Sequence, residues 1–146
     1  MNIFAHDGNF GHMLARTSRA MLNMLQKKFR QTGCDITVEQ WILLINIRNI
    51  DGQSQQQLAA RVYLDKTTIA RVVTGLEKKG LISRRTSKVD RRQKRLVITK
   101  KAAAVLAELK PVALAAQQQV LENVDPAKLE HCCEVLQQVH STVLDM

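Results

Sequence analysis

LDKTTIARVVTGLEKKGLI, residues 64–82, has the pattern of one amphipathic helix with a signal at each end. Asp65 belongs to the residue types favoured at an N-cap, because its carboxylate accepts hydrogen bonds from the free N–H groups of the first turn. Four apolar residues then recur at helical spacing and would share one buried face: Ile69, Val72, Val73 and Leu76. Gly80 stands where a left-handed C-terminal cap requires glycine. We therefore predict a helix from Lys66 to Lys79.

A shorter helix is predicted just before this one. Ser54 and Gln57 have the spacing of a capping box, in which each side chain reaches the other's backbone N–H group. The helix would continue to about Arg61, with Leu58 and Val62 on its apolar side. Two helices joined by so brief a connection are typical of a helix-turn-helix.

The segment after Gly80 changes from a helical period to strands. Leu81–Thr86 and Lys94–Ile98 read as two short strands, and residues 87–92 between them are polar, charged and too many for a tight turn. We predict a β-hairpin with an extended tip, which is called a wing in this fold class.

Two helices are expected on the N-terminal side. Apolar residues at positions 10, 14, 21, 25 and 29 form one stripe of an amphipathic helix over roughly Asn9–Gln31, which Gly33 would end. Thr37 and Gln40 have the spacing of a second capping box and would open a helix that the Asp51-Gly52 turn closes.

Two more helices are expected on the C-terminal side. Thr99 would cap a long alanine-rich helix that ends near Asn123, and Pro111 should kink it. Asp125 as cap and Pro126 at the first helical position would open a last helix that ends near Val143.

The predicted fold class is mainly α with a small β-hairpin wing, a winged helix-turn-helix with long terminal dimerisation helices. Residues 1–146 would form a single domain, with the DNA-binding lobe at 36–99 and the dimerisation helices at 1–35 and 100–146. Apolar residues of the last two helices form a surface that we expect to meet a second copy: Val120, Leu121, Val124, Leu129, Val135, Leu136, Val139, Val143 and Leu144. The alternative is that they simply complete the core of a monomer.

The positive charge of the chain is concentrated in one segment. The net charge is +9, and residues 61–101 hold fourteen Lys and Arg against three acids, so the remaining residues carry eight basic and ten acidic side chains. A basic face of this kind is typical of a protein that binds a polyanion such as nucleic acid. A charged face that only keeps the protein soluble is the alternative.

Composition sets the cellular context that we expect. No apolar run approaches 18 residues and the first residues lack the order of a secretory signal, so we expect neither a membrane span nor export. An odd number of cysteines (Cys34, Cys132 and Cys133) is a poor disulfide framework, and a reducing cytoplasm is the simpler interpretation.

The predicted recognition helix would place its N-terminal side chains against base edges in the major groove. Those side chains are Lys66, Thr67, Thr68 and Arg71. Arg71 can donate to two guanine acceptors at once, and a threonine can offer a hydroxyl or a methyl group to a base. Helix capping alone for the threonines, and a solvated side chain for Arg71, are the alternatives.

Two further elements would contact DNA. Ser54, Gln55 and Gln56 open the preceding helix, whose free N–H groups and dipole favour a phosphate. At the wing tip an arginine can enter a narrow minor groove, where the negative potential is strongest, while Asp90 would pair with a nearby arginine and shape the tip. The arginines in question are Arg91 and Arg92; a merely soluble loop is the alternative.

These motifs resemble those of MarR-family regulators. The resemblance rests on residues 64–73 and 76–82, the wing run Asp90-Arg91-Arg92, and the run at 96–99, with a matching order of elements over nearly the whole chain. One departure is Ala102, where many members have glycine. The resemblance implies an obligate homodimer joined through its terminal helices, a repressor on a pseudo-palindromic double-stranded DNA operator, and Arg92 as the minor-groove arginine with Asp90 as its partner. It also implies a small, often phenolic or anionic, ligand that weakens DNA binding in many members.

The ligand-binding residues are less clearly marked. An apolar cleft with one cation would suit an aromatic acid, and Met13, Arg16, Trp41 and Ile45 could line it; ordinary core or surface positions are the alternative, which fits each of them better. Nothing marks the pKa of Cys34 as lowered, and we expect Cys132 and Cys133 in a buried interface. The histidines lack metal-ligand spacing and no nucleophile or phosphate-loop motif is present, so we expect no metal, no cofactor and no enzyme activity.

Three functions remain open on the sequence alone. The first is a ligand-responsive regulator, with a redox-responsive regulator of the same fold as a variant of it. The second is an architectural protein that coats DNA without sequence preference, which needs only phosphate contacts. The third is a winged-helix protein-interaction module, which leaves the basic segment unexplained.

Overall fold

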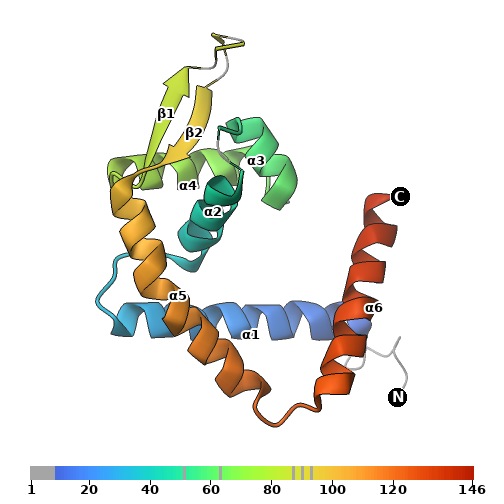
Figure 1. Ribbon diagram of the computed structural model, residues 1–146. Helices are drawn as coiled ribbons and strands as arrows, with labels where there is room; N and C mark the ends of the chain where they lie inside the picture. Colours follow the sequence, from blue (N-terminus) through green and yellow to red (C-terminus); the bar gives the residue numbers. More distant parts are fainter. Residues whose placement is uncertain (1–8, 51, 63, 87, 90, 93) are drawn as a thin grey trace. The chain divides into compact units, whose positions relative to one another are not determined.

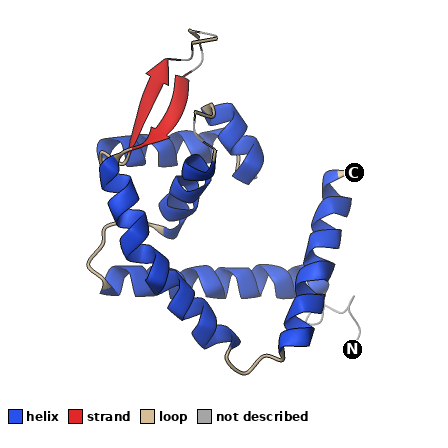
Figure 2. Ribbon diagram, in the orientation of Figure 1, coloured by secondary structure: helices blue, strands red, loops and turns tan. Residues whose placement is uncertain are grey.

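The computed structural model describes residues 9–50, 52–62, 64–86, 88–89, 91–92 and 94–146. Over these residues the chain forms six helices and one two-stranded antiparallel sheet (Figures 1 and 2). The elements follow in this order: α1 Phe10–Gln31, α2 Val38–Asn49, α3 Gln55–Val62, α4 Lys66–Lys78, β1 Ile82–Thr86, β2 Lys94–Ile98, α5 Lys100–Leu121 and α6 Pro126–Leu144. The predicted fold class is confirmed, and the predicted element ends agree to within about two residues.

The predicted helix ends are formed by the expected side chains. Asp65 caps α4 with an extended backbone, and Thr37 and Gln40 form the capping box that opens α2. Gly80 has a φ of 71°, in the left-handed region where a Cβ would be strained. Local sequence signals therefore set the boundaries of these helices.

The wing hairpin pairs in a single register. Ile82 lies opposite Ile98, and Thr86 lies opposite Lys94 at the distal end. A bridge between Ser54 and Arg95 attaches the start of α3 to the outer edge of β2, and the Leu96 N–H donates to the Gln53 carbonyl oxygen at 2.9 Å. The base of the wing is thus fixed to the helix-turn-helix.

The main core lies in the part of the chain that ends at Ala113. It is aliphatic apart from Phe29, and its fully buried large side chains come from several helices, the turn before β1, and β2: Phe29, Leu43, Leu44, Ile47, Leu58, Ile69, Val73, Leu76, Leu81, Leu96, Leu106 and Leu109. Phe29 packs edge-on against Trp41 with ring centroids 5.4 Å apart. This contact attaches the end of α1 to the helix-turn-helix lobe.

The chain divides into two compact units, one up to Ala113 and one from Leu114 to Met146. The division falls inside α5, which continues through Pro111 as a helix. In the second unit α6 begins with Asp125 as cap and Pro126 in its first turn, as predicted. None of the α6 residues, all of which the structure describes, is buried.

Candidate nucleic-acid interface

The outer face of α4 is a stripe of polar and basic side chains. Thr67, Arg71, Thr74 and Lys78 are exposed, while the apolar residues of the opposite face are buried in the core. The stripe exists because residues four and three apart lie on the same side of a helix. An exposed helix face of this composition can enter a DNA major groove.

Thr67 and Thr68, which we predicted together, have different environments. The Thr68 backbone N–H donates to Asp65 Oδ1 at 2.8 Å, and its hydroxyl donates to Asp65 Oδ2 at 2.7 Å. These two hydrogen bonds hold the pKa of the Asp65 carboxyl below its ordinary value, and the bond from the Thr68 backbone N–H makes the larger contribution. The only hydroxyl proton of Thr68 is used in the cap. Thr67 is therefore the threonine whose own hydroxyl can donate to a base.

Arg71 has a partner that the sequence did not suggest. Its Nη2 atom lies 3.3 Å from Glu39 Oε2 in the first turn of α2, with the two side chains 67% and 55% exposed. The pair joins residues 32 positions apart, so no local pattern could have revealed it. The guanidinium therefore stays exposed at the surface, and the ion pair directs it toward Glu39.

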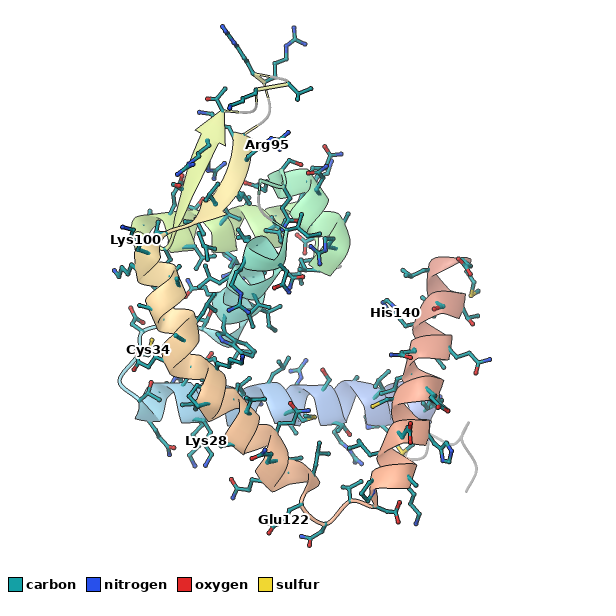
Figure 3. The ribbon with its side chains drawn as sticks, in the orientation of Figure 1. Lys28, Cys34, Arg95, Lys100, Glu122 and His140 are labelled. Atoms are coloured by element: carbon teal, nitrogen blue, oxygen red, sulfur yellow. The ribbon has the colours of Figure 1, made fainter. Side chains whose placement is uncertain are left out.

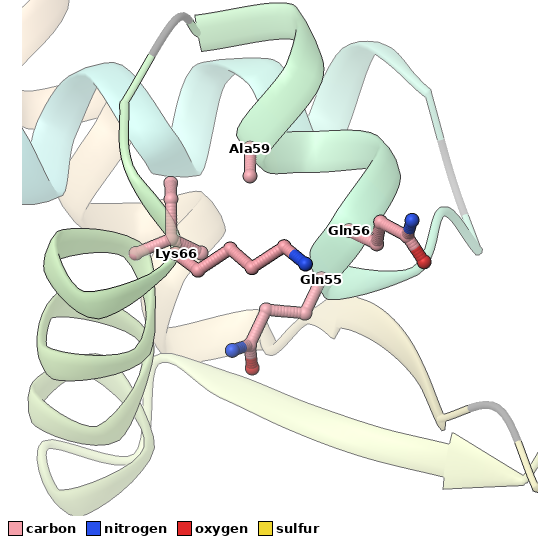
Figure 4. A pocket seen from close by; sticks show the side chains of 5 residues that line it. Gln55, Gln56, Ala59 and Lys66 are labelled. Carbon is pink, nitrogen blue, oxygen red and sulfur yellow. The ribbon is translucent and has the colours of Figure 1, made fainter.

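The start of α3 carries the predicted capping box. Ser54 Oγ accepts from the Gln57 N–H at 3.1 Å, and Gln57 Oε1 accepts from the Ser54 N–H at 2.9 Å. Gln55, Gln56 and Lys66 meet around a hollow of about 300 Å³ between α3 and α4, where Lys66 extends toward Gln55 (Figure 4). The structure thus brings together polar side chains that we had assigned separately to phosphate and base contacts.

The wing presents Arg91 and Arg92 as exposed side chains. Asp90, predicted to shape the tip, lies outside the described residues. Arg84 on β1 pairs with Glu77 near the end of α4 at 3.1 Å, which connects the hairpin to the recognition helix.

Two lysines support the C-terminal end of α4. Lys101 Nζ donates to the Lys79 carbonyl oxygen at 2.7 Å, and Lys79 Nζ donates to the Asp35 carbonyl oxygen at 2.6 Å and to Gln40 Oε1 at 3.0 Å. Cations are favourable at this end of a helix dipole. These residues hold α4 in place, a role that we did not predict because their partners are distant in sequence.

The four residues proposed to line a ligand cleft do not meet within one chain. Trp41 lies against Phe29 at the end of α1, and Ile45 packs at the edge of the same core. Met13 and Arg16 lie 16 and 13 residues before Phe29 in that helix, about 24 and 20 Å along its axis at 1.5 Å per residue. The Trp41 indole N–H is buried with no hydrogen-bond partner among the described residues.

The three cysteines are all free thiols. Cys34 lies half-buried between α1 and α2 (Figure 3), while Cys132 and Cys133 on α6 are exposed in the single chain, so their expected burial in an interface stays a prediction. Burial raises the pKa of the Cys34 thiol, Glu108 and Asp35 raise it further, and Lys79 opposes them. A thiol with a raised pKa forms less of the nucleophilic thiolate.

The described residues contain neither a membrane-spanning helix nor a metal-binding cluster. No helix among them is long and apolar enough to cross a membrane. Their His, Cys, Asp and Glu side chains form no group of three or more that could hold a metal ion.

Known proteins resemble this chain in both sequence and structure. The model of the MarR family matches residues 36–94. The transcriptional regulator PA3341 is 30% identical, with a TM-score of 0.81 over 94% of this chain and 99% of that one.

Two more distant structures share the fold. The MarR-family transcriptional regulator from Rhodococcus sp. RHA1 is 23% identical, with a TM-score of 0.81 over 93% of this chain and 96% of that one. BpsR of Bordetella bronchiseptica, whose DNA binding is regulated by 6-hydroxynicotinic acid, is 20% identical, with a TM-score of 0.85 over 94% of this chain and 96% of that one. Because the family model covers the helix-turn-helix and the wing as far as the start of β2, and a regulator 30% identical is matched over nearly its whole length, the chain belongs to the MarR family of transcriptional regulators.

Proposed function

We propose that this protein is a cytoplasmic, homodimeric, sequence-specific repressor of transcription that a small ligand releases from double-stranded DNA. The observation that carries the proposal is the exposed stripe of Thr67 and Arg71 on α4, because both side chains can contact base edges. It belongs to the strongly basic segment 61–101, which supplies the attraction to phosphate.

Each chain contributes one recognition helix and one wing. Two copies related by a two-fold axis would place their recognition helices about 34 Å apart, one turn of DNA, on a pseudo-palindromic operator. Arg92 would enter the adjacent minor groove, and the start of α3 would meet a phosphate. The exposed apolar side chains of α6 supply a surface for the second copy.

The ligand would be a small aromatic or anionic compound. The distance along α1 separates Met13 and Arg16 from Trp41, so a cleft lined by all of them requires α1 of the second copy. The buried, unpartnered indole N–H of Trp41 would gain a ligand acceptor there. The regulation of BpsR by an aromatic acid is a precedent within the same fold.

The competing function is an architectural protein that binds DNA without sequence preference. A competition assay against random DNA separates the two, because regulators prefer their site by roughly 10³–10⁷-fold. A protein of either function would bind DNA more weakly as the salt concentration rises. For the dimer we expect the plot of log binding constant against log salt concentration to have a slope of magnitude at least about 5.

Substitution of Arg71 tests base recognition directly. Arg71→Ala should cost roughly 1–3 kcal/mol at the specific site and relax the base preference at one position in each half-site. Arg92→Ala should instead flatten the preference for A·T-rich flanks, because a narrow minor groove attracts arginine. Uniform weakening by Arg71→Ala across a library of operator variants at fixed salt would favour the architectural function.

A further inference from the structure

The ion pair between Glu39 and Arg71 joins the first turn of α2 to the exposed outer stripe of α4. Glu39 is on the first turn of α2 and Arg71 is on the outer stripe of α4, with Glu39 Oε2 3.3 Å from Arg71 Nη2. A carboxylate is unexpected here, because it weakens the positive field that attracts phosphate. Its position calls for a role that outweighs this electrostatic cost.

The geometry leaves most of the guanidinium available. Arginine has five N–H donors in a planar fork, and the 3.3 Å contact uses only Nη2. Four donors remain, and two of them can serve the O6 and N7 acceptors of a guanine. An unpaired arginine would lose rotamer entropy when fixed against a base, and a pair formed before binding reduces that loss.

We propose that Glu39 is a positioning residue that orients the guanidinium of Arg71 for base recognition without itself touching DNA. The proposal rests on the proposed function, since it requires Arg71 to read a base. The pair is weak while both side chains are exposed, and it strengthens when docked DNA excludes water around it. Glu39 thus increases discrimination between bases and lowers affinity for DNA in general.

The chain provides a matched control for the loss of one negative charge. Glu77 on α4 pairs with Arg84 of β1 at 3.1 Å, and this pair does not involve Arg71. Glu39→Gln and Glu77→Gln remove the same charge from the same lobe. Any general electrostatic gain should therefore be similar in the two variants.

The experiment measures binding of the full-length dimer to a library of operator variants and to random DNA at fixed salt. Glu39→Gln should reduce discrimination at the base position that Arg71 reads by about threefold to tenfold. Glu77→Gln should leave that discrimination unchanged, and both variants should bind random DNA slightly more tightly. In an Arg71→Ala background, Glu39→Gln should have no further effect on base preference.

Each contrary result has a distinct meaning. If Arg71→Ala relaxes base preference but Glu39→Gln acts only as Glu77→Gln does, the positioning role is wrong and the proposed function stands. If the effect of Glu39→Gln persists in the Arg71→Ala background, Glu39 contacts a base itself, for instance a cytosine amino group, and the proposal is wrong. If Arg71→Ala changes no base preference, base reading by Arg71 and the positioning role fail together.

Discussion

The residues up to Ala113 and those from Leu114 to Met146 are both rich in apolar side chains, yet they bury them very differently. In the first unit leucine, isoleucine and valine from four helices and both strands fill one core. In the second unit, all of which the structure describes, Ala116 is the only buried residue, while Val135 and Leu144 are 49% and 52% exposed. Where such exposed apolar side chains form a contiguous patch, the patch marks a site of contact with another molecule.

The difference separates two kinds of stability. The first unit has its own core, so its folding should not depend on protein concentration. The second unit has little interior of its own, and its apolar residues gain free energy only if something covers them. Four predictions test this contrast, in order of decreasing effect.

Removing a core side chain from the first unit should have the largest effect. Leu43→Ala empties a fully buried position in α2, and we expect it to lower the free energy of unfolding by about 2–5 kcal/mol. Urea unfolding at several protein concentrations would measure this loss, which should be independent of concentration. Val143→Ala on α6, 62% exposed, is the matched comparison, and any loss there should shrink on dilution as the dimer dissociates. Equal and concentration-independent losses would contradict the contrast.

A charge on the apolar face of α6 should weaken a dimer. For Val135→Asp we expect the dissociation constant to rise by about 10- to 100-fold, because an unpaired polar group would be buried against the second copy. Gln137→Asp adds the same charge to an exposed polar position of the same helix and should have little effect. Sedimentation equilibrium would measure both variants. A wild-type protein that is monomeric at micromolar concentration would disprove the predicted dimer.

The cap of the recognition helix should give the first unit a small dependence on acid. The pKa of Asp65 is lowered in the fold, chiefly by the Thr68 N–H, so the ionised carboxylate stabilises the folded state. That contribution is fully present above the unfolded pKa of about 3.9 and is lost as the pH falls through the lower folded pKa.

Asp65→Asn isolates this effect, because asparagine can still cap the helix but does not ionise. The stability difference between wild type and variant should shrink as the pH falls from 6 to 2, as followed by urea unfolding. A difference that is constant over this range would show that the carboxylate charge is unimportant.

The smallest expected effect is at the half-buried cysteine of the first unit. Cys34→Ser should leave any response of DNA binding to peroxide unchanged, since burial and nearby carboxylates raise the pKa of this thiol. A gel-shift titration with peroxide compares variant and wild type. Release by peroxide that disappears in Cys34→Ser would instead favour the redox-responsive alternative.

Much of the candidate site could be predicted because it depends on short-range patterns. The capping residues, the apolar period of α4 and the strand pattern each involve residues within a few positions of one another, so they determine the local backbone conformation directly. The same local logic did not distinguish Thr67 from Thr68. Capping was named as an alternative for both, and the hydrogen bonds to Asp65 assign it to Thr68 alone.

The residues that hold the site in place could not be predicted in this way. Glu39 meets Arg71 across 32 positions, and Lys79 meets Gln40 across 39. Such pairs depend on how helices pack, and many lysines and glutamates in the chain have no feature that distinguishes them. For the same reason the four proposed ligand-binding residues looked compatible in sequence, although the length of α1 keeps Met13 and Arg16 away from Trp41.

By itself the sequence determined the fold class, the order and ends of the elements, and the concentration of positive charge in residues 61–101, because each depends on composition or on neighbours along the chain. Only the tertiary structure decided which side chains of α4 face outward with free donors, which carboxylate pairs with Arg71, and which apolar residues are left exposed. These outcomes depend on distances between segments far apart in sequence, and packing of the whole chain sets those distances.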